Sequence, residues 1–180
     1  MHRVAVATLF AAAITSIAAI TTVTAPLPHP HFQKKIECRL ADDLVITLTH
    51  LTVTFNREGE AKLPAGGSWH LANSHLETTG DIRIGGHDVK AGKYALKGRK
   101  TEAGGWELVL DDAGRFQAKI GDNAKALATE FVATAPLREH LDVDIQPSGD
   151  KTSTTLWLEV WFDTRLARTK IELPQKADKK

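Results

Sequence analysis

Histidines beside carboxylates are the residues of this chain best suited to chemistry. Four of them fall at predicted turns or strand ends: His70, His75, His87 and His140. Acidic residues follow or precede them closely in the sequence: Glu77, Asp81, Asp88 and Glu139. Imidazole and carboxylate groups together are typical ligands of zinc, copper or iron. One hypothesis is therefore a hydrolase or a metal-dependent enzyme that uses His70, His75 and His140 as a cluster.

The spacing of these histidines does not support such a site. Residues of one strand share a face only at even offsets, and the offset from His70 to His75 is odd. The chain contains no H-E-x-x-H and no C-x-x-C, and its H-x-H lies in a proline-rich stretch, His29-Pro30-His31. No G-x-S-x-G elbow marks a nucleophilic serine. We therefore assign no catalytic residue, no metal ligand and no cofactor.

Tryptophans offer a second kind of chemistry, the stacking of a ligand ring. Trp157 and Trp161 lie on one predicted strand at an even offset, so their rings point the same way. The opposite face of that strand is apolar and belongs to the core: Leu156, Leu158, Val160 and Phe162. The two rings form a binding surface if their face is exposed. The alternative is a strand that is buried on both faces.

The segment from Trp69 to His75 is the other candidate binding site. It mixes aromatic and polar side chains after a glycine-rich loop, and loops on a rigid sandwich commonly carry function. In the alternative interpretation Asn73 satisfies the backbone of a turn and Trp69 packs at the edge of the core. With His140 and the pair on the later strand, the candidate ligand-binding residues are Trp69, His70, Asn73, His75, His140, Trp157 and Trp161. The ligand could be a small molecule, a glycan or a peptide.

The N-terminus predicts export. Met1-His2-Arg3 is basic, residues 4–20 carry no charge, and small residues and then Pro26 follow. We expect a signal peptide at residues 1–25 and a proline-rich linker at residues 26–35. An uncleaved anchor is the alternative, but the run is shorter than the roughly 20 apolar residues that a membrane span needs. The mature chain is then periplasmic or secreted, with no stable membrane span.

Charge and cysteine content narrow the choice of partner. Without Arg3, the 23 basic residues become 22, against 22 acidic ones. A neutral chain has no field to steer it onto nucleic acid or an anionic membrane. The single cysteine, Cys38, cannot form an internal disulfide, and we expect a buried, inert thiol. Residues 175–180 form a short basic tail.

Alternation with a period of two dominates the rest of the chain and predicts an all-β fold. Roughly nine or ten short apolar–polar runs are separated by Gly, Asp and Asn turns, which is typical of a sandwich or barrel. We expect one antiparallel β-sandwich over residues 36–174. Residues 125–132 fit a strand or a single helical turn, and we favour the strand. The alternation changes phase near Thr49-His50, which indicates either a β-bulge or two strands around a tight bend.

Three motifs resemble a known family. They are Trp69-His70-Leu71-Ala72-Asn73, Val89-Lys90-Ala91-Gly92-Lys93-Tyr94-Ala95-Leu96 and Gly105-Trp106-Glu107-Leu108-Val109-Leu110-Asp111. They are similar to the W-R-x-G-A-N, A-G-x-Y-S-L and W-T-(I/V)-I-(L/F)-N segments of a bacterial exported family, domain-of-unknown-function family 2911. Here the first motif is one residue short, His70 replaces the arginine, and Asp111 replaces the asparagine. The resemblance implies export and a sandwich fold, and it implies no mechanism.

Tyr94 in the second motif has a structural explanation. Ala91-Gly92 allows a sharp corner, and Tyr94 can bury its ring and donate its hydroxyl to the backbone across that corner. Taken together, the patterns favour an exported, non-catalytic binding or envelope-associated module.

Overall fold

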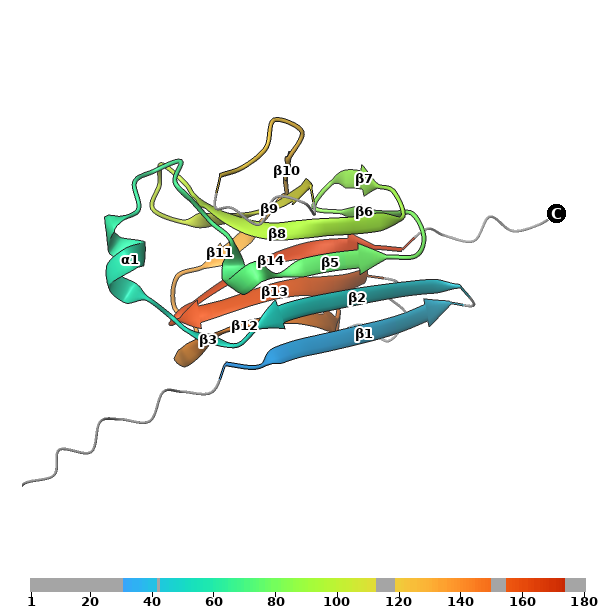
Figure 1. Cartoon of the computed structure of the whole chain (residues 1–180), viewed down its shortest axis with the longest axis horizontal. Coiled ribbons are helices and arrows are strands. Elements are labelled where there is room, and N and C mark those ends of the chain that lie inside the picture. The colour runs from blue at the N-terminus through green and yellow to red at the C-terminus, as the bar shows by residue number, and fades with distance from the viewer. Residues whose placement is uncertain (1–30, 42, 113–118, 150–154, 174–180) are drawn as a thin grey trace, which may run out of the picture. The chain divides into compact units, whose positions relative to one another are not determined.

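Two antiparallel sheets packed face to face form the body of the molecule (Figure 1). The computed structural model describes residues 31–41, 43–112, 119–149 and 155–173. The two packed sheets confirm the predicted all-β sandwich. The predicted signal peptide, the linker up to Pro30 and the basic tail lie outside the described residues.

Each sheet has seven strands, all paired antiparallel. The first sheet runs in the order β1 (Gln33–Ala41), β2 (Leu44–Leu51), β5 (His75–Thr78), β8 (Gly92–Lys100), β9 (Trp106–Asp112) and β10 (Lys125–Ala126), with β4 (Ser68–Trp69) also paired to β8. The second runs β3 (Val53–Thr54), β12 (Arg138–Pro147), β13 (Thr155–Asp163), β14 (Arg165–Glu172), β6 (Ile82–Ile84) and β7 (His87–Val89), with β11 (Glu130–Val132) paired to β14. The described chain also has two short helical segments outside the sheets, α1 (Arg57–Lys62) and the 3₁₀ turn η1 (Leu71–Asn73).

The core lies between the two sheets and follows the alternation of the sequence. Ile46 and Leu48 of β2 face Val143 of β12 and Leu158 and Val160 of β13 within one cluster, and none of the five side chains is exposed. Burying each such side chain contributes about 1.5–3 kcal/mol. The inward parity of these strands is the one that the sequence predicts.

The phase change near Thr49-His50 marks a crossing between sheets. β2 ends at Leu51 in the first sheet, and β3 begins at Val53 in the second. The inner faces of the two sheets point in opposite directions, so a strand that changes sheets must change parity. The second of the two predicted alternatives, two strands around a bend, is therefore the right one.

Two turns have well-defined geometry, and the second of them was predicted from the sequence. Gly85 and Gly86 connect β6 to β7 with positive φ angles of 55° and 85°, as a two-residue hairpin requires. The Tyr94 hydroxyl donates to the Lys90 carbonyl at 2.9 Å, which confirms the corner.

Other local predictions differ from the structure. β1 begins at Gln33, inside the expected linker. The all-β prediction did not include the short helix α1, which begins at Arg57 because the Asn56 side chain accepts from the Gly59 N–H at 2.9 Å and caps the helix. Residues 125–132 form not one strand but two, β10 and β11, which pair with different sheets.

Candidate functional site

Trp157 and Trp161 lie on the outer face of the second sheet, on the side of β13 that points away from the core. Both are half-buried, so the strand is not covered on both faces. A cation lies over each ring instead. The Arg168 guanidinium carbon is 4.4 Å from the Trp157 ring centre, and the Arg138 guanidinium carbon is 5.3 Å from that of Trp161. Such contacts hold the rings in place at a wet surface.

Three cross-strand rows extend this arrangement over β12, β13 and β14. We call Trp157, Glu159 and Trp161, with their neighbours in register, the tryptophan ladder. The rows are Gln146–Trp157–Lys170, Asp144–Glu159–Arg168 and Asp142–Trp161–Leu166. Directly opposed residues have their Cβ atoms about 4.5–5.5 Å apart, so each ring is flanked by polar or aliphatic side chains.

Glu159 fixes the middle of the ladder. It is only 9% exposed, and its Oε2 accepts the Trp161 indole N–H at 3.1 Å. Its Oε1 lies 4.0 Å from an Nη1 of Arg168. Arg168 also donates two hydrogen bonds to Glu130 of β11, at 3.1 and 3.0 Å, and these bonds lower the pKa of the Glu130 carboxyl. Glu130 is therefore ionised at neutral pH.

A groove of about 460 Å³ adjoins Trp157. Its walls are Trp157, Arg168, Lys170, Glu130 and Glu172, and its floor includes the Gly85-Gly86 turn. The turn is fixed to the rest of the sheet, because Gly85 N–H donates to the Lys170 carbonyl at 2.9 Å and the Gly85 carbonyl accepts from Ala128 N–H at 3.0 Å. The volume falls within the range of about 300–1,000 Å³ that is usual for small-molecule sites.

Trp69 belongs to a different place. Its ring contacts Phe55, Trp106 and Phe162 at centroid distances of 5.6, 5.8 and 5.9 Å. It is half-buried against the core, so the interpretation of Trp69 as packing at the core edge is the one that the structure favours. Its exposed part lines a small pocket beneath α1.

The residues after Trp69 form a left-handed turn. Leu71, Ala72 and Asn73 have φ angles of 42°, 55° and 56°, in a region that costs most side chains about 1–2 kcal/mol per residue and that asparagine tolerates better than leucine or alanine. The Ser74 hydroxyl and N–H both donate to the Leu71 carbonyl, and Asn73 N–H donates to the His70 carbonyl at 3.1 Å. A turn at Asn73 was one of the two interpretations of this segment, but its left-handed backbone could not be predicted, because residues 70–74 contain no glycine.

The three histidines of the enzyme hypothesis are not gathered into one site. His75 opens β5 of the first sheet and is buried, which lowers the pKa of its imidazole. His70 precedes η1, next to β4 of that sheet, and has a buried Nδ1 without a partner in the described part of the chain. His140 lies in the second sheet, opposite Thr54. Among residues 31–41, 43–112, 119–149 and 155–173, no three His, Cys, Asp or Glu side chains are grouped to hold a metal ion.

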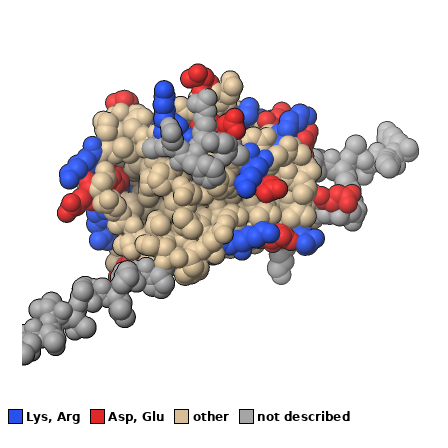
Figure 2. Space-filling view, viewed as in Figure 1, with Lys and Arg blue, Asp and Glu red and all other residues tan. Residues whose placement is uncertain are grey.

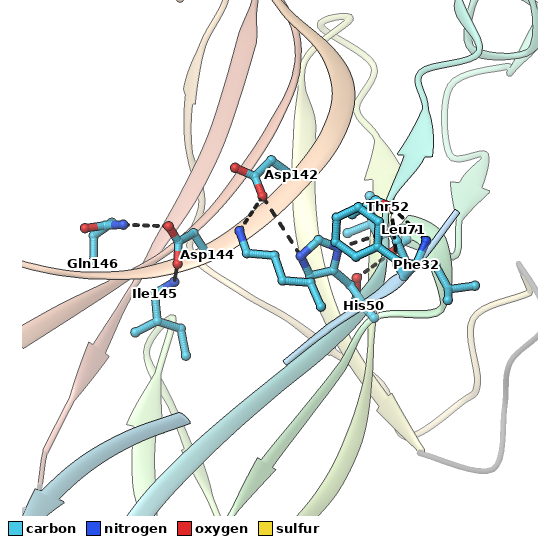
Figure 3. Close-up of polar contacts among 11 residues, drawn as sticks. Phe32, His50, Thr52, Leu71, Asp142, Asp144, Ile145 and Gln146 are labelled. Atoms are coloured by element: carbon cyan, nitrogen blue, oxygen red, sulfur yellow. Dashed lines mark hydrogen bonds and ion pairs between the residues drawn. The ribbon is translucent and has the colours of Figure 1, made fainter. Parts of the chain in front are cut away.

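A polar cluster that the sequence did not predict joins the two sheets at their β1–β12 side (Figure 3). Lys34 Nζ donates to Asp142 Oδ1 at 2.9 Å, and His50 Nε2 lies 4.0 Å from the same oxygen. The His50 side chain is fully buried, and this burial lowers the pKa of its imidazole. His50 and Asp142 resemble a catalytic pair, but a ring without exposure offers a substrate no access.

Cys38 in β1 is half-buried and free. Its thiol has a pKa raised first by burial and then by the charge of Asp144. The thiol is therefore protonated and a poor nucleophile, as expected of an inert cysteine.

Comparison with protein-family models, with curated proteins and with solved structures gives no match for this chain. Membership of domain-of-unknown-function family 2911 therefore stays a prediction from the three sequence motifs. Within the described ranges, no helix has the length and apolar character needed to cross a membrane.

Proposed function

We propose that the chain is an exported, non-catalytic binding module that holds a glycan in the groove beside Trp157. The observation that carries this proposal is the half-buried Trp157 ring at the wall of a groove of about 460 Å³. The signal peptide expected at residues 1–25 would place the module in the periplasm or outside the cell.

Charge balance in the groove favours an uncharged ligand. Arg168 and Lys170 supply two positive charges, and Glu130 and Glu172 supply two negative ones. A sugar ring suits such a site, because its hydroxyls both donate to carboxylates and accept from cations. Its C–H face can pack on the part of the half-buried Trp157 ring that Arg168 and Lys170, 4.4 and 5.4 Å from the ring centre, leave exposed. The forked guanidinium of Arg168 already bonds Glu130 with two N–H groups, so these two side chains enter the site in a fixed orientation.

The same groups are poorly suited to hydrolysis of the glycan. A glycosidase needs one carboxyl group that stays protonated to serve as general acid. Glu130 cannot fill that role, because its hydrogen bonds with Arg168 lower its pKa. Glu172, the other carboxyl group of the groove, is engaged in an ion pair with Arg83, with Oε2 and Nε 3.5 Å apart. The groove therefore supports binding better than bond cleavage.

A glycan array probed with the purified chain tests the proposal, followed by titration calorimetry of the best neutral oligosaccharide. Trp157→Ala should weaken binding about tenfold, a loss of about 1.4 kcal/mol, and Trp157→Tyr should retain most of the affinity. Trp161→Ala is the matched control, because Trp161 shares the ladder but does not line the groove. Unchanged binding by Trp157→Ala, or an array without any bound glycan, would refute the proposal.

A further inference from the structure

β1 forms a long edge of the first sheet, at the lower side of Figure 1. It has nine residues, whereas β3, β7 and β10, the other strands that end the two sheets, have two or three. Among the described residues, β1 pairs with β2 only. Native proteins usually shorten or cover such an edge, because its free N–H and C=O groups are a template for another strand. The edge of β1 is therefore a candidate interface.

Hydrogen bonds on both sides of β2 show which backbone groups of β1 face outward. The Phe32 carbonyl accepts from Thr52 N–H at 2.9 Å, so it faces β2. The Val45 carbonyl, opposite Arg39, accepts from Thr79 N–H at 3.0 Å and so faces β5 and not β1. Successive residues of a strand direct their backbone groups to opposite sides, so both observations place the same residues of β1 at the free edge. They are Gln33, Lys35, Glu37 and Arg39.

Charges of opposite sign alternate along this edge. The side chains of Lys35, Glu37 and Arg39 share the exposed face of β1, and Glu37 lies 3.5 Å from Lys35 Nζ and 2.6 Å from Arg39 Nη2. A row of lysines protects an edge, because it repels an approaching strand. The order positive, negative, positive is different, because an antiparallel copy of the same strand can match each charge with its opposite.

Only some registers of two such strands are favourable. A pair must join residues whose backbone groups both face outward, so the registers differ by steps of two residues. Lys35 opposite Lys35, or Glu37 opposite Glu37, brings like charges together, which is destabilising. With Ile36 opposite Ile36, Lys35 of each copy lies opposite Glu37 of the other, and both charge pairs are attractive.

The register centred on Ile36 also covers the whole strand. It brings Phe32, which is 60% exposed, next to Leu40 of the second copy. The register centred on Cys38 matches Glu37 with Arg39, but it would place Gln33 and Phe32 opposite residues beyond Ala41, where β1 ends. Charge and length together therefore favour the register centred on Ile36.

We infer that β1 pairs antiparallel with β1 of a second copy, with Ile36 opposite Ile36, so that the chain is a two-fold symmetric dimer. Such an interface is self-complementary and closes on itself, so the pairing ends at two copies. The inference does not depend on the glycan groove, because β1 belongs to the first sheet and Trp157 to the second.

Sedimentation velocity of the purified chain over a series of loading concentrations tests the dimer. Lys35→Glu places like charges opposite each other twice and should raise the dissociation constant of the dimer about tenfold. The double variant Lys35→Glu with Glu37→Lys exchanges the charges and should restore the affinity. Lys62→Glu is the matched control, because it makes the same change of charge at an exposed position on α1.

Disulfide trapping tests the register. Opposed residues whose backbone groups face away from each other have Cα atoms about 4.5 Å apart, which a disulfide can bridge. Ile36→Cys in a Cys38→Ser background should therefore give a covalent dimer on mild oxidation, whereas the unmodified chain, with Cys38 opposite Lys34, should not.

Several results would overturn the inference. They are a monomer at every loading concentration, a dimer that Lys35→Glu leaves unchanged, a double variant as weak as the single one, and a disulfide between two Cys38 residues. Absence of a covalent dimer from a folded Ile36→Cys variant would overturn it as well. If that variant does not fold, the charge variants and the oxidation of the unmodified chain decide the matter.

Discussion

The surroundings of the His50 ring are formed by residues from three different strands. The ring lies on β2, Lys34 approaches from β1, and Asp142 approaches from β12. Its Nδ1 faces the Leu51 carbonyl at 3.2 Å, so Nδ1 carries the hydrogen and Nε2 remains without a partner in the described part of the chain. The neutral ring is favoured, because burial has the largest effect on its pKa and lowers it.

This arrangement predicts that His50 makes the fold sensitive to mild acid. An imidazole whose pKa is lower in the folded state contributes stability above its unfolded pKa of about 6.5, and this contribution is lost as pH falls through the folded pKa. The free energy of unfolding, measured by urea titration, should therefore decline below about pH 6.5. His50→Gln should make the decline shallower, and His31→Gln, at an exposed position, should not. An identical pH profile for His50→Gln would contradict this role.

The sequence identified Trp157 and missed His50 for a physical reason. The parity of β13 places Trp157 opposite the apolar residues of the same strand, so the pattern alone shows that it faces outward. His50 has the inward parity of Ile46 and Leu48, and it is the last inward-facing residue of β2 before the chain passes to the other sheet. Its partners come from 16 residues before it and 92 after it (50 − 34 and 142 − 50), and no local pattern brings such residues together.

At the scale of elements, alternation predicted the strands well and their interruptions poorly. The apolar–polar alternation predicts which face of β8 and β9 points into the core, but it does not predict that residues on the opposite face are buried by other parts of the chain. Lys97 and Asp111 have outward parity and are nevertheless buried, with Nζ and Oδ2 2.7 Å apart. Lys97 Nζ also donates to the Lys119 carbonyl at 2.8 Å, and Gly121 N–H donates to Asp111 at 2.9 Å. Lys119 and Gly121 therefore cover this buried ion pair.

The left-handed turn between β4 and β5 is the other interruption. Trp69 pairs with Gly98 and His75 pairs with Ala95, so the five residues from 70 to 74 replace the two that a regular strand would place opposite Leu96 and Lys97. Leu71 and Ala72 turn inward and are buried, which offsets part of the cost of their backbone angles. The turn thus separates Trp69 of β4 from His75 of β5, and both strands still pair with β8.

Asn73 at the exposed tip of this turn allows the strain to be measured. Asn73→Ala should lower the free energy of unfolding by about 1 kcal/mol, because alanine lacks the tolerance of asparagine for a left-handed backbone. Asn73→Gly should be neutral or stabilising, since glycine adopts a φ of 56° without steric cost. Urea unfolding of the two variants provides the comparison. Equal destabilisation by alanine and glycine would mean that Asn73 contributes through its side chain and not through its backbone.

The whole molecule is close to electrical neutrality, and this bears on what it can bind. The chain has a formal net charge of +1 at pH 7. Charged side chains of both signs lie next to one another around the face shown in Figure 2. The proposed groove follows the same rule, since its two cations are matched by Glu130 and Glu172. Long-range attraction therefore contributes little at the groove, and recognition depends on contact.

Salt provides the test of this view at the scale of the molecule. If the groove binds a neutral glycan through contact, its Kd should change by less than about twofold between 50 and 500 mM NaCl, where the Debye length falls from about 14 to about 4 Å. An anionic glycan held by Arg168 and Lys170 would instead lose affinity steeply over that range. Lys170→Gln separates the two cases further. The substitution replaces one hydrogen-bonding side chain by another, so the affinity for a neutral ligand should fall only a few-fold. An anionic ligand would instead lose one of the two positive charges that hold it, and its affinity should fall further. A steep salt dependence in titration calorimetry would therefore reassign the groove to an acidic ligand while leaving Trp157 as its aromatic wall.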